Sequence, residues 1–172
     1  MKPTFHIITA VTRTANLEAI GYALNQQARR HDIHWHVRFD PQHSSVGGQT
    51  IKNRILYQIP NDPENWVILL DDDTLIHYDL LATVEAHIGP DTNAVVVSQQ
   101  KRDGSVLWAM PENVKVGNID TGQVVMRRSF LGEERLLDAY EGDGLLFEKL
   151  LRGAQGVVYI PEILSFHNVL TK

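Results

Sequence analysis

The chain has 172 residues, of which 43% are hydrophobic and 22% are charged. This length fits one domain, and the hydrophobic content is sufficient to bury a core, so intrinsic disorder is not expected. The formal net charge of -5 provides no strongly basic surface for nucleic acid. Cysteine is absent, which excludes disulfide scaffolds, thiol nucleophiles and cysteine-ligated zinc.

The apolar segments of the chain are short. The first residues contain no long apolar run, so we expect no cleaved signal peptide. The longest apolar runs have the length of a strand, well below the roughly 20 residues of a transmembrane helix. We therefore expect a cytoplasmic protein without a transmembrane segment, whose contact with any membrane would be peripheral.

Strand and helix patterns alternate along the first half of the chain. Runs rich in β-branched and apolar residues, as in strands, lie at 5–11, 34–39, 66–70 and 94–98. Apolar residues at helical spacing lie at 17–30, 51–59 and 79–87. This order predicts an α/β fold with a parallel, doubly wound sheet. In the second half we expect strands at 123–126 and 157–160 and a helix at 144–152.

Three consecutive aspartates, Asp71, Asp72 and Asp73, directly follow the most continuous apolar run. Adjacent carboxylates repel one another, and a divalent cation between them relieves that repulsion. Oxygen ligands suit Mg²⁺ or Mn²⁺ that also bind substrate phosphates. Strand alternation would place Asp71 and Asp73 on one side and Asp72 on the other. The alternative is a strand-end turn in which the aspartates cap backbone amides.

The segment Asp71-Asp72-Asp73-Thr74 is close in composition to Asp-x-Asp-x-Thr, the nucleophile motif of haloacid-dehalogenase-type phosphatases. Thr74 follows Asp73 immediately, so the spacing differs by one residue. That motif also ends the first strand of its fold, whereas this triplet follows a later strand. The sequence therefore does not favour a phosphatase.

Four features, in chain order, resemble the GT-A glycosyltransferases, above all family 2, and are similar to the glucuronyltransferase-like families. The tip of the first strand, with Thr9, Thr12 and Arg13, resembles the segment that holds the nucleotide base. Asp40 follows the second strand, where the family places an acidic residue against the base or ribose. The third feature has two parts. Lys52-Asn53-Arg54 resembles the family's Arg/Asn helix, and Asp71-Asp72-Asp73 after it resembles the family's Asp-x-Asp motif.

The fourth feature resembles the Glu-Asp motif that supplies the catalytic base in this family. Here the doublet is split, because Gly142 separates Glu141 from Asp143. The base assignment is therefore open between the two, and we favour Asp143. His167 lies where related enzymes place a histidine on the metal or the diphosphate.

The resemblance implies a GT-A-like, mostly parallel sheet flanked by helices in one domain spanning 1–172. Residues 1–100 would bind the nucleotide, and residues 101–172 would bind the acceptor and carry the catalytic base. The implied enzyme is a hexosyltransferase-type glycosyltransferase that uses Mn²⁺ or Mg²⁺, held by Asp73 with Asp71 and His167. Its substrates would be a nucleotide-sugar donor and a hydroxyl group on a glycan, lipid or protein, and transfer would be inverting.

Two other functions remain open. A sugar nucleotidyltransferase normally has a glycine-rich loop after the first strand, and residues 9–16 contain no glycine. A nucleotide-sugar-binding protein without transferase activity is the second, because the chain is short for a complete transferase. The histidines at 31, 34 and 36 fit no standard zinc pattern, and we predict that they are surface residues.

Overall fold

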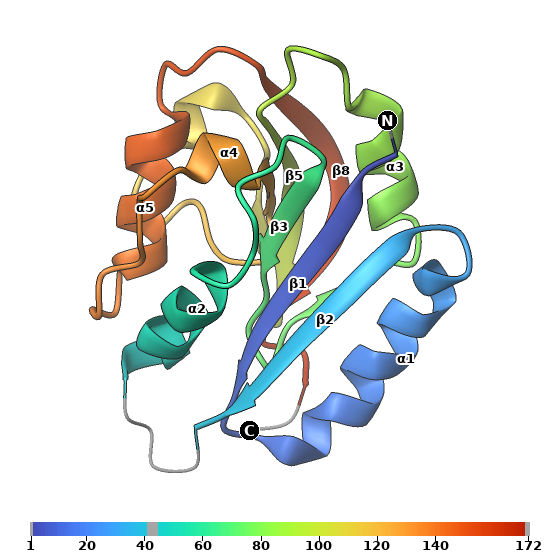
Figure 1. Ribbon diagram of the computed structural model, residues 1–172. Helices are drawn as coiled ribbons and strands as arrows, with labels where there is room; N and C mark the ends of the chain where they lie inside the picture. Colours follow the sequence, from blue (N-terminus) through green and yellow to red (C-terminus); the bar gives the residue numbers. More distant parts are fainter. Residues whose placement is uncertain (1, 41–44, 171–172) are drawn as a thin grey trace.

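The computed structural model describes residues 2–40 and 45–170. Within them, eight strands form one mixed sheet in the order β2-β1-β3-β7-β5-β8-β4, with β6 paired to β5 (Figure 1). The strands are β1 (Thr4–Val11), β2 (Asp32–Phe39), β3 (Asn65–Leu69), β4 (Leu75–Ile76), β5 (Ala94–Lys101), β6 (Val106–Leu107), β7 (Val124–Arg127) and β8 (Val157–His167).

Short helices pack on both faces of the sheet (Figure 1). They are α1 (Leu17–Ala28), α2 (Gln49–Leu56), α3 (Leu80–His87), α4 (Arg128–Leu131) and α5 (Gly142–Leu151). One apolar core joins α1 and α3 to the sheet, and the other joins α2, α4 and α5 to the opposite face. Because both faces are covered, β3 can be a continuous apolar run, and its residues 66–69 are all buried.

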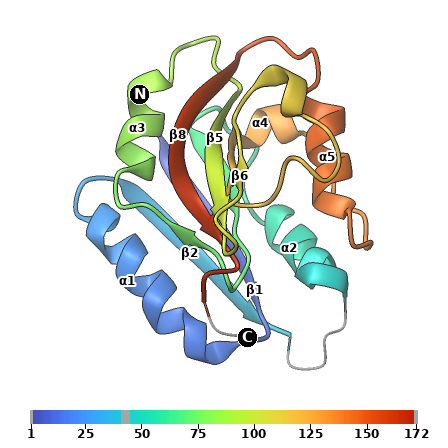
Figure 2. The same cartoon turned by 180° about the vertical axis from the view of Figure 1, so that it is seen from behind.

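The prediction of a GT-A-like, mostly parallel sheet is wrong, because the sheet is mixed and curls into a half-barrel. β7 lies between β3 and β5 and runs antiparallel to both. β6 is antiparallel to β5, and β4 is antiparallel to β8. Figure 2 shows the long, curved β8 from behind. The strand–helix alternation ends after β5, where a hairpin leads to β6, and no long helical crossover is available to make β7 parallel.

The positions of most elements agree with the sequence patterns. All the predicted strands and helices are present, with ends shifted by a few residues. Three elements were not predicted, namely β4, β6 and α4, which contain only two to four residues each. β8 continues to His167, seven residues past the predicted end at 160, and passes through Pro161.

The mixed topology brings distant segments to one edge of the sheet. The parallel strands β1, β2 and β3 all end there, so residues 71–74 emerge at that edge. β7 begins there, and the Gly122 amide donates to the Leu69 carbonyl over 2.8 Å. β8 runs parallel to β5 and also ends there, at His167. This edge positions the candidate site.

None of the helices within residues 2–40 and 45–170 combines the length and the apolar character needed to cross a membrane.

Candidate functional site

A cleft of about 360 Å³ opens at this edge of the sheet. Its floor and walls come from α2, the end of β3, the end of β5, the segment before β7, the segment around the start of α5, and the end of β8. The side chains and backbone that line it belong to Val46, Gly47, Gln49, Lys52, Asp71, Lys101, Leu107, Gly117, Ile119, Asp120, Thr121, Leu136, Tyr140, Glu141, Asp143, Gly144 and His167.

Asp71 lies at the floor of the cleft and has two side-chain partners. The Lys52 ammonium, which is only 2% exposed, forms an ion pair with one carboxylate oxygen. The Thr121 hydroxyl donates to the other oxygen over 2.7 Å. Although desolvation opposes ionisation, Lys52 and Thr121 lower the pKa of Asp71 below its ordinary value. Asp71 is therefore held as a carboxylate.

A pair of carboxyl groups, Asp120 and Asp143, lies beside Asp71. The Thr121 amide donates to Asp120 over 2.7 Å and to Asp143 over 3.3 Å, and the two carboxyl groups also hydrogen-bond each other. Burial, the hydrogen bond with Asp143 and the negative charge of Asp71 together raise the pKa of Asp120 well above its ordinary value. The two carboxyl groups therefore titrate as a coupled pair.

His167, at the end of β8, closes the cluster. Its Nδ1 lies 3.2 Å from an Asp120 carboxyl oxygen, and its side chain is partly exposed to the cleft. Lys101, at the end of the neighbouring β5, lines the same wall. Lys101 and His167 thus line the same cleft as Asp71, Asp120 and Asp143.

Asp72 and Asp73 belong to a separate network next to the cleft. Asp72 accepts hydrogen bonds from the backbone amides of Thr12 and Arg13, over 2.7 Å and 2.8 Å, and from the Thr12 hydroxyl. The Arg13 guanidinium pairs with Asp72 over 2.8 Å and with Asp73 over 2.6 Å. The expected alternation is therefore wrong: β3 ends at Leu69, the chain turns at 71–74, and Asp72 and Asp73 share a partner while Asp71 does not.

The predicted metal ligands do not form a metal site in this arrangement. Asp73 is bonded to Arg13, Asp71 to Lys52 and Thr121, and His167 lies against Asp120. Within residues 2–40 and 45–170, no group of three or more histidine, aspartate or glutamate side chains is placed to hold a metal ion. A requirement for Mn²⁺ or Mg²⁺ stays a prediction.

The remaining predicted residues have diverse positions. Thr9 is fully buried and accepts a hydrogen bond from the Trp35 indole over 3.1 Å. Asp40 is buried at the end of β2, and its amide donates to the Val11 carbonyl. Arg54 is exposed on α2, whereas Glu141 lines the cleft at the start of α5. The cleft therefore brings together Lys52, Asp71, Glu141, Asp143 and His167 from the predicted set, and the others lie outside it.

Asn53, predicted to bind substrate, instead holds the backbone of a neighbouring segment. Its side-chain amide donates to the Leu136 carbonyl over 2.8 Å and accepts from the Leu136 amide over 3.0 Å. Gln49, one turn earlier on α2, makes the same pair of bonds with Ala139, over 2.8 Å and 3.1 Å. We call these four hydrogen bonds the amide clamp.

The glycine that splits the Glu-Asp doublet has a structural explanation. A Cβ at Gly142 would lie 2.0 Å from the Leu137 carbonyl oxygen and 2.5 Å from the Gln49 side chain. Only glycine lets the start of α5 approach the clamped segment this closely. The approach sets Asp143 in the first turn of α5, facing the cleft.

Several lining residues had no signal in the sequence. Lys101, Gln49 and Tyr140 meet at the cleft from segments far apart in the chain, which periodicity does not reveal. Gln49, for example, bonds to Ala139, which is 90 residues away. Thr121 belongs to the glycine-bearing turn Asp120-Thr121-Gly122, a local pattern that does not reveal its partners. Its bonds to three carboxyl groups follow from the antiparallel start of β7 beside β3.

Comparison with known proteins adds no family assignment. The chain matches no model of a protein family, and no curated protein matches its sequence.

Proposed function

We propose that this protein transfers a sugar from a nucleoside-diphosphate donor to a hydroxyl group of an acceptor. The observation that carries the proposal is the Asp120–Asp143 carboxyl pair at the cleft. Asp143 lies in the first turn of α5 and lines the cleft, and we assign it as the member of the pair that accepts the proton. A carboxylate poised in this way is suited to remove a proton from an attacking hydroxyl.

In the proposed reaction, the acceptor oxygen attacks the anomeric carbon as its proton passes to Asp143. The bond from the anomeric carbon to the diphosphate oxygen breaks, and the nucleoside diphosphate departs from the opposite side. A single displacement of this kind inverts the anomeric configuration. Lys101 and His167 are the cleft groups available to stabilise the negative charge of the leaving group.

The carboxyl geometry argues against glycoside hydrolysis at the same cleft. Hydrolases place a sugar between two carboxyl groups that lie about 5 to 9.5 Å apart. Asp120 and Asp143 hydrogen-bond each other, so a glycosidic bond does not fit between them. Asp71 is occupied by Lys52 and Thr121, so it is not available as a second catalytic carboxylate.

The proposal is tested by incubating the full chain with a panel of UDP- and GDP-sugars and measuring release of nucleoside diphosphate. Transfer is identified by mass spectrometry of the glycosylated product, and the configuration of that product by NMR. Release with an inverted product supports the proposal, whereas binding without release favours a nucleotide-sugar-binding protein. Formation of pyrophosphate from a nucleoside triphosphate and a sugar phosphate favours a nucleotidyltransferase.

The same experiment, repeated with Mn²⁺ and with EDTA, tests the metal prediction. Release that persists in EDTA indicates that the cationic side chains of the cleft suffice. Release that requires Mn²⁺ indicates a rearrangement on donor binding, because Arg13 would have to leave Asp73 or Lys52 would have to leave Asp71.

A further inference from the structure

Tyr140 is the most exposed of the large hydrophobic residues at the cleft. Its side chain is 91% exposed, yet it lines the cleft only three residues before Asp143. Tyr140 therefore contributes an aromatic side chain to the lining of the cleft that also contains the proposed base, Asp143.

The segment that carries Tyr140 is fixed in place. The amide clamp holds Leu136 and Ala139, and the Val46 amide donates to the Asp138 carboxylate over 2.8 Å. In both ribbon views this segment returns beside α2 before α5 begins (Figures 1 and 2). The backbone that carries Tyr140 is therefore held in place without a ligand, which lowers the entropic cost of ordering this segment on binding.

The charges around Tyr140 indicate what kind of acceptor fits. Glu141 follows it directly, Asp143 is three residues after Tyr140, and Asp120 lies next to Asp143. These carboxyl groups repel an anionic acceptor, and they accept hydrogen bonds from hydroxyl groups. A sugar ring matches both features, because it presents an apolar C–H face to an aromatic ring and hydroxyl groups at its edge.

We propose that Tyr140 is an acceptor-specificity residue, a platform for the ring of a neutral carbohydrate whose hydroxyl group faces Asp143. This inference rests on the proposed function and narrows its acceptor class to a glycan. Leu107 also contributes apolar surface to the lining of the cleft.

Saturation-transfer NMR with methyl glycosides of glucose, galactose, mannose and N-acetylglucosamine tests the proposal without a donor. At least one glycoside is expected to bind the wild-type chain, with saturation strongest on protons of one ring face. Tyr140→Ala should weaken that binding about tenfold, and Tyr140→Phe should retain it. Tyr22→Ala is the matched control, since Tyr22 is 70% exposed on α1 and does not line the cleft.

Two results would overturn the platform: no glycoside binds, or Tyr140→Ala binds as tightly as the wild-type chain. A separate thermal-shift series with UDP and GDP reports on the donor side. If a glycoside binds through Tyr140 but no donor is bound or consumed, the proposed transfer fails while the sugar subsite stands. If transfer occurs and Tyr140→Ala leaves the KM of a glycan acceptor unchanged, the platform fails while the transferase stands.

Discussion

At the scale of single residues, the buried ion pair of Lys52 and Asp71 is the costliest feature of the cleft floor. An ammonium group that is 2% exposed loses nearly all its hydration, and only a close carboxylate compensates for that loss. The Thr121 hydroxyl satisfies the second oxygen of Asp71. Lys52 therefore neutralises Asp71 at the floor of the cleft.

Replacing Lys52 by methionine is expected to lower the free energy of unfolding by about 3 kcal/mol, because Asp71 is left without its cation. The midpoint of urea denaturation measures this loss of stability. Arg54→Met, on the exposed face of the same helix, should change the free energy by less than about 0.5 kcal/mol. Equal midpoints for Lys52→Met and Arg54→Met would show that the ion pair contributes nothing.

Gly142 provides a second test at this scale. Gly142→Ala should destabilise the fold by roughly 1–3 kcal/mol, because its Cβ meets the Leu137 carbonyl and the chain must shift. Gly89→Ala is the control, since the nearest atom to its Cβ is 3.6 Å away. Thermal denaturation compares the two variants, and a Gly142→Ala midpoint as high as that of Gly89→Ala would contradict the close approach.

At the scale of elements, α2 holds the segment before α5 through the amide clamp. Asn53→Leu keeps the approximate volume but leaves the Leu136 amide and carbonyl without their side-chain partner. We expect a loss of about 1–3 kcal/mol in the free energy of unfolding, read by urea denaturation. Gln58→Leu, at an exposed position just after α2, should be nearly neutral, and a similar loss in both variants would argue against the clamp.

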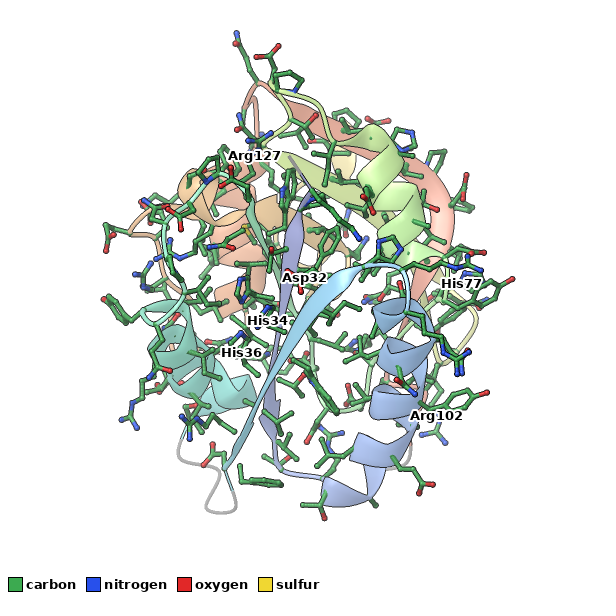
Figure 3. The ribbon with its side chains drawn as sticks, turned by 45° about the vertical axis from the view of Figure 1, so that its right-hand side comes forward. Asp32, His34, His36, His77, Arg102 and Arg127 are labelled. Atoms are coloured by element: carbon green, nitrogen blue, oxygen red, sulfur yellow. The ribbon has the colours of Figure 1, made fainter. Side chains whose placement is uncertain are left out.

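Strands β1 and β2 carry a cluster of three histidines, His6, His34 and His36, and Figure 3 shows the latter two following Asp32 along β2. The His6 ring stacks on His34 and His36 with centroids 5.1 Å and 5.3 Å apart. His6 also contacts His36 and the Asn65 side chain, over 3.0 Å and 3.1 Å. Of the three histidines predicted at the surface, His31, His34 and His36, only His34 is exposed. His36 is partly buried, and the His31 side chain is 7% exposed and lies 2.7 Å from the Glu85 carboxylate.

The cluster makes stability depend on pH. Burial and the neighbouring imidazoles lower the pKa of both His6 and His36 in the folded state. The unfolded chain, with histidine near its ordinary value of about 6.5, therefore binds more protons as the pH falls. Stability should be complete above about pH 6.5 and decline as the solution is acidified below it. Urea midpoints at pH 7.5 and pH 5 measure this decline.

His36→Gln removes one member of the cluster and should reduce the decline between pH 7.5 and pH 5. An identical decline in the variant and the wild-type chain would show that the pH dependence arises elsewhere.

At the scale of the whole molecule, the sequence predicted the elements better than their arrangement. Apolar runs such as 66–70 locate strands because burial on both faces demands them. The residues of β7 do not determine its direction, since an apolar strand packs equally well parallel or antiparallel to its neighbours. It depends on how segment 108–123 returns, and that segment contains one short 3-10 helix and several turns.

In the candidate site, too, the sequence predicted individual residues better than the contacts between them. Asp71, Asp143, His167 and Lys52 were identifiable because acidic and basic residues at strand and helix ends form local patterns. The pairing of Asp120 with Asp143 was not, because it needs the start of β7 to lie beside the end of β3. The predicted nucleotide segment, Thr12 and Arg13, is instead engaged by Asp72 and Asp73.

The central claim is that Asp143 removes the acceptor proton during sugar transfer, and the rate of Asp143→Asn tests it most directly. Asparagine preserves the shape of the first turn of α5, so equal thermal midpoints establish that the variant is folded. With a donor and acceptor that the wild-type chain uses, Asp143→Asn should be roughly 100- to 10,000-fold slower. Transfer at the wild-type rate, or loss of transfer in Glu141→Gln instead, would contradict the claim.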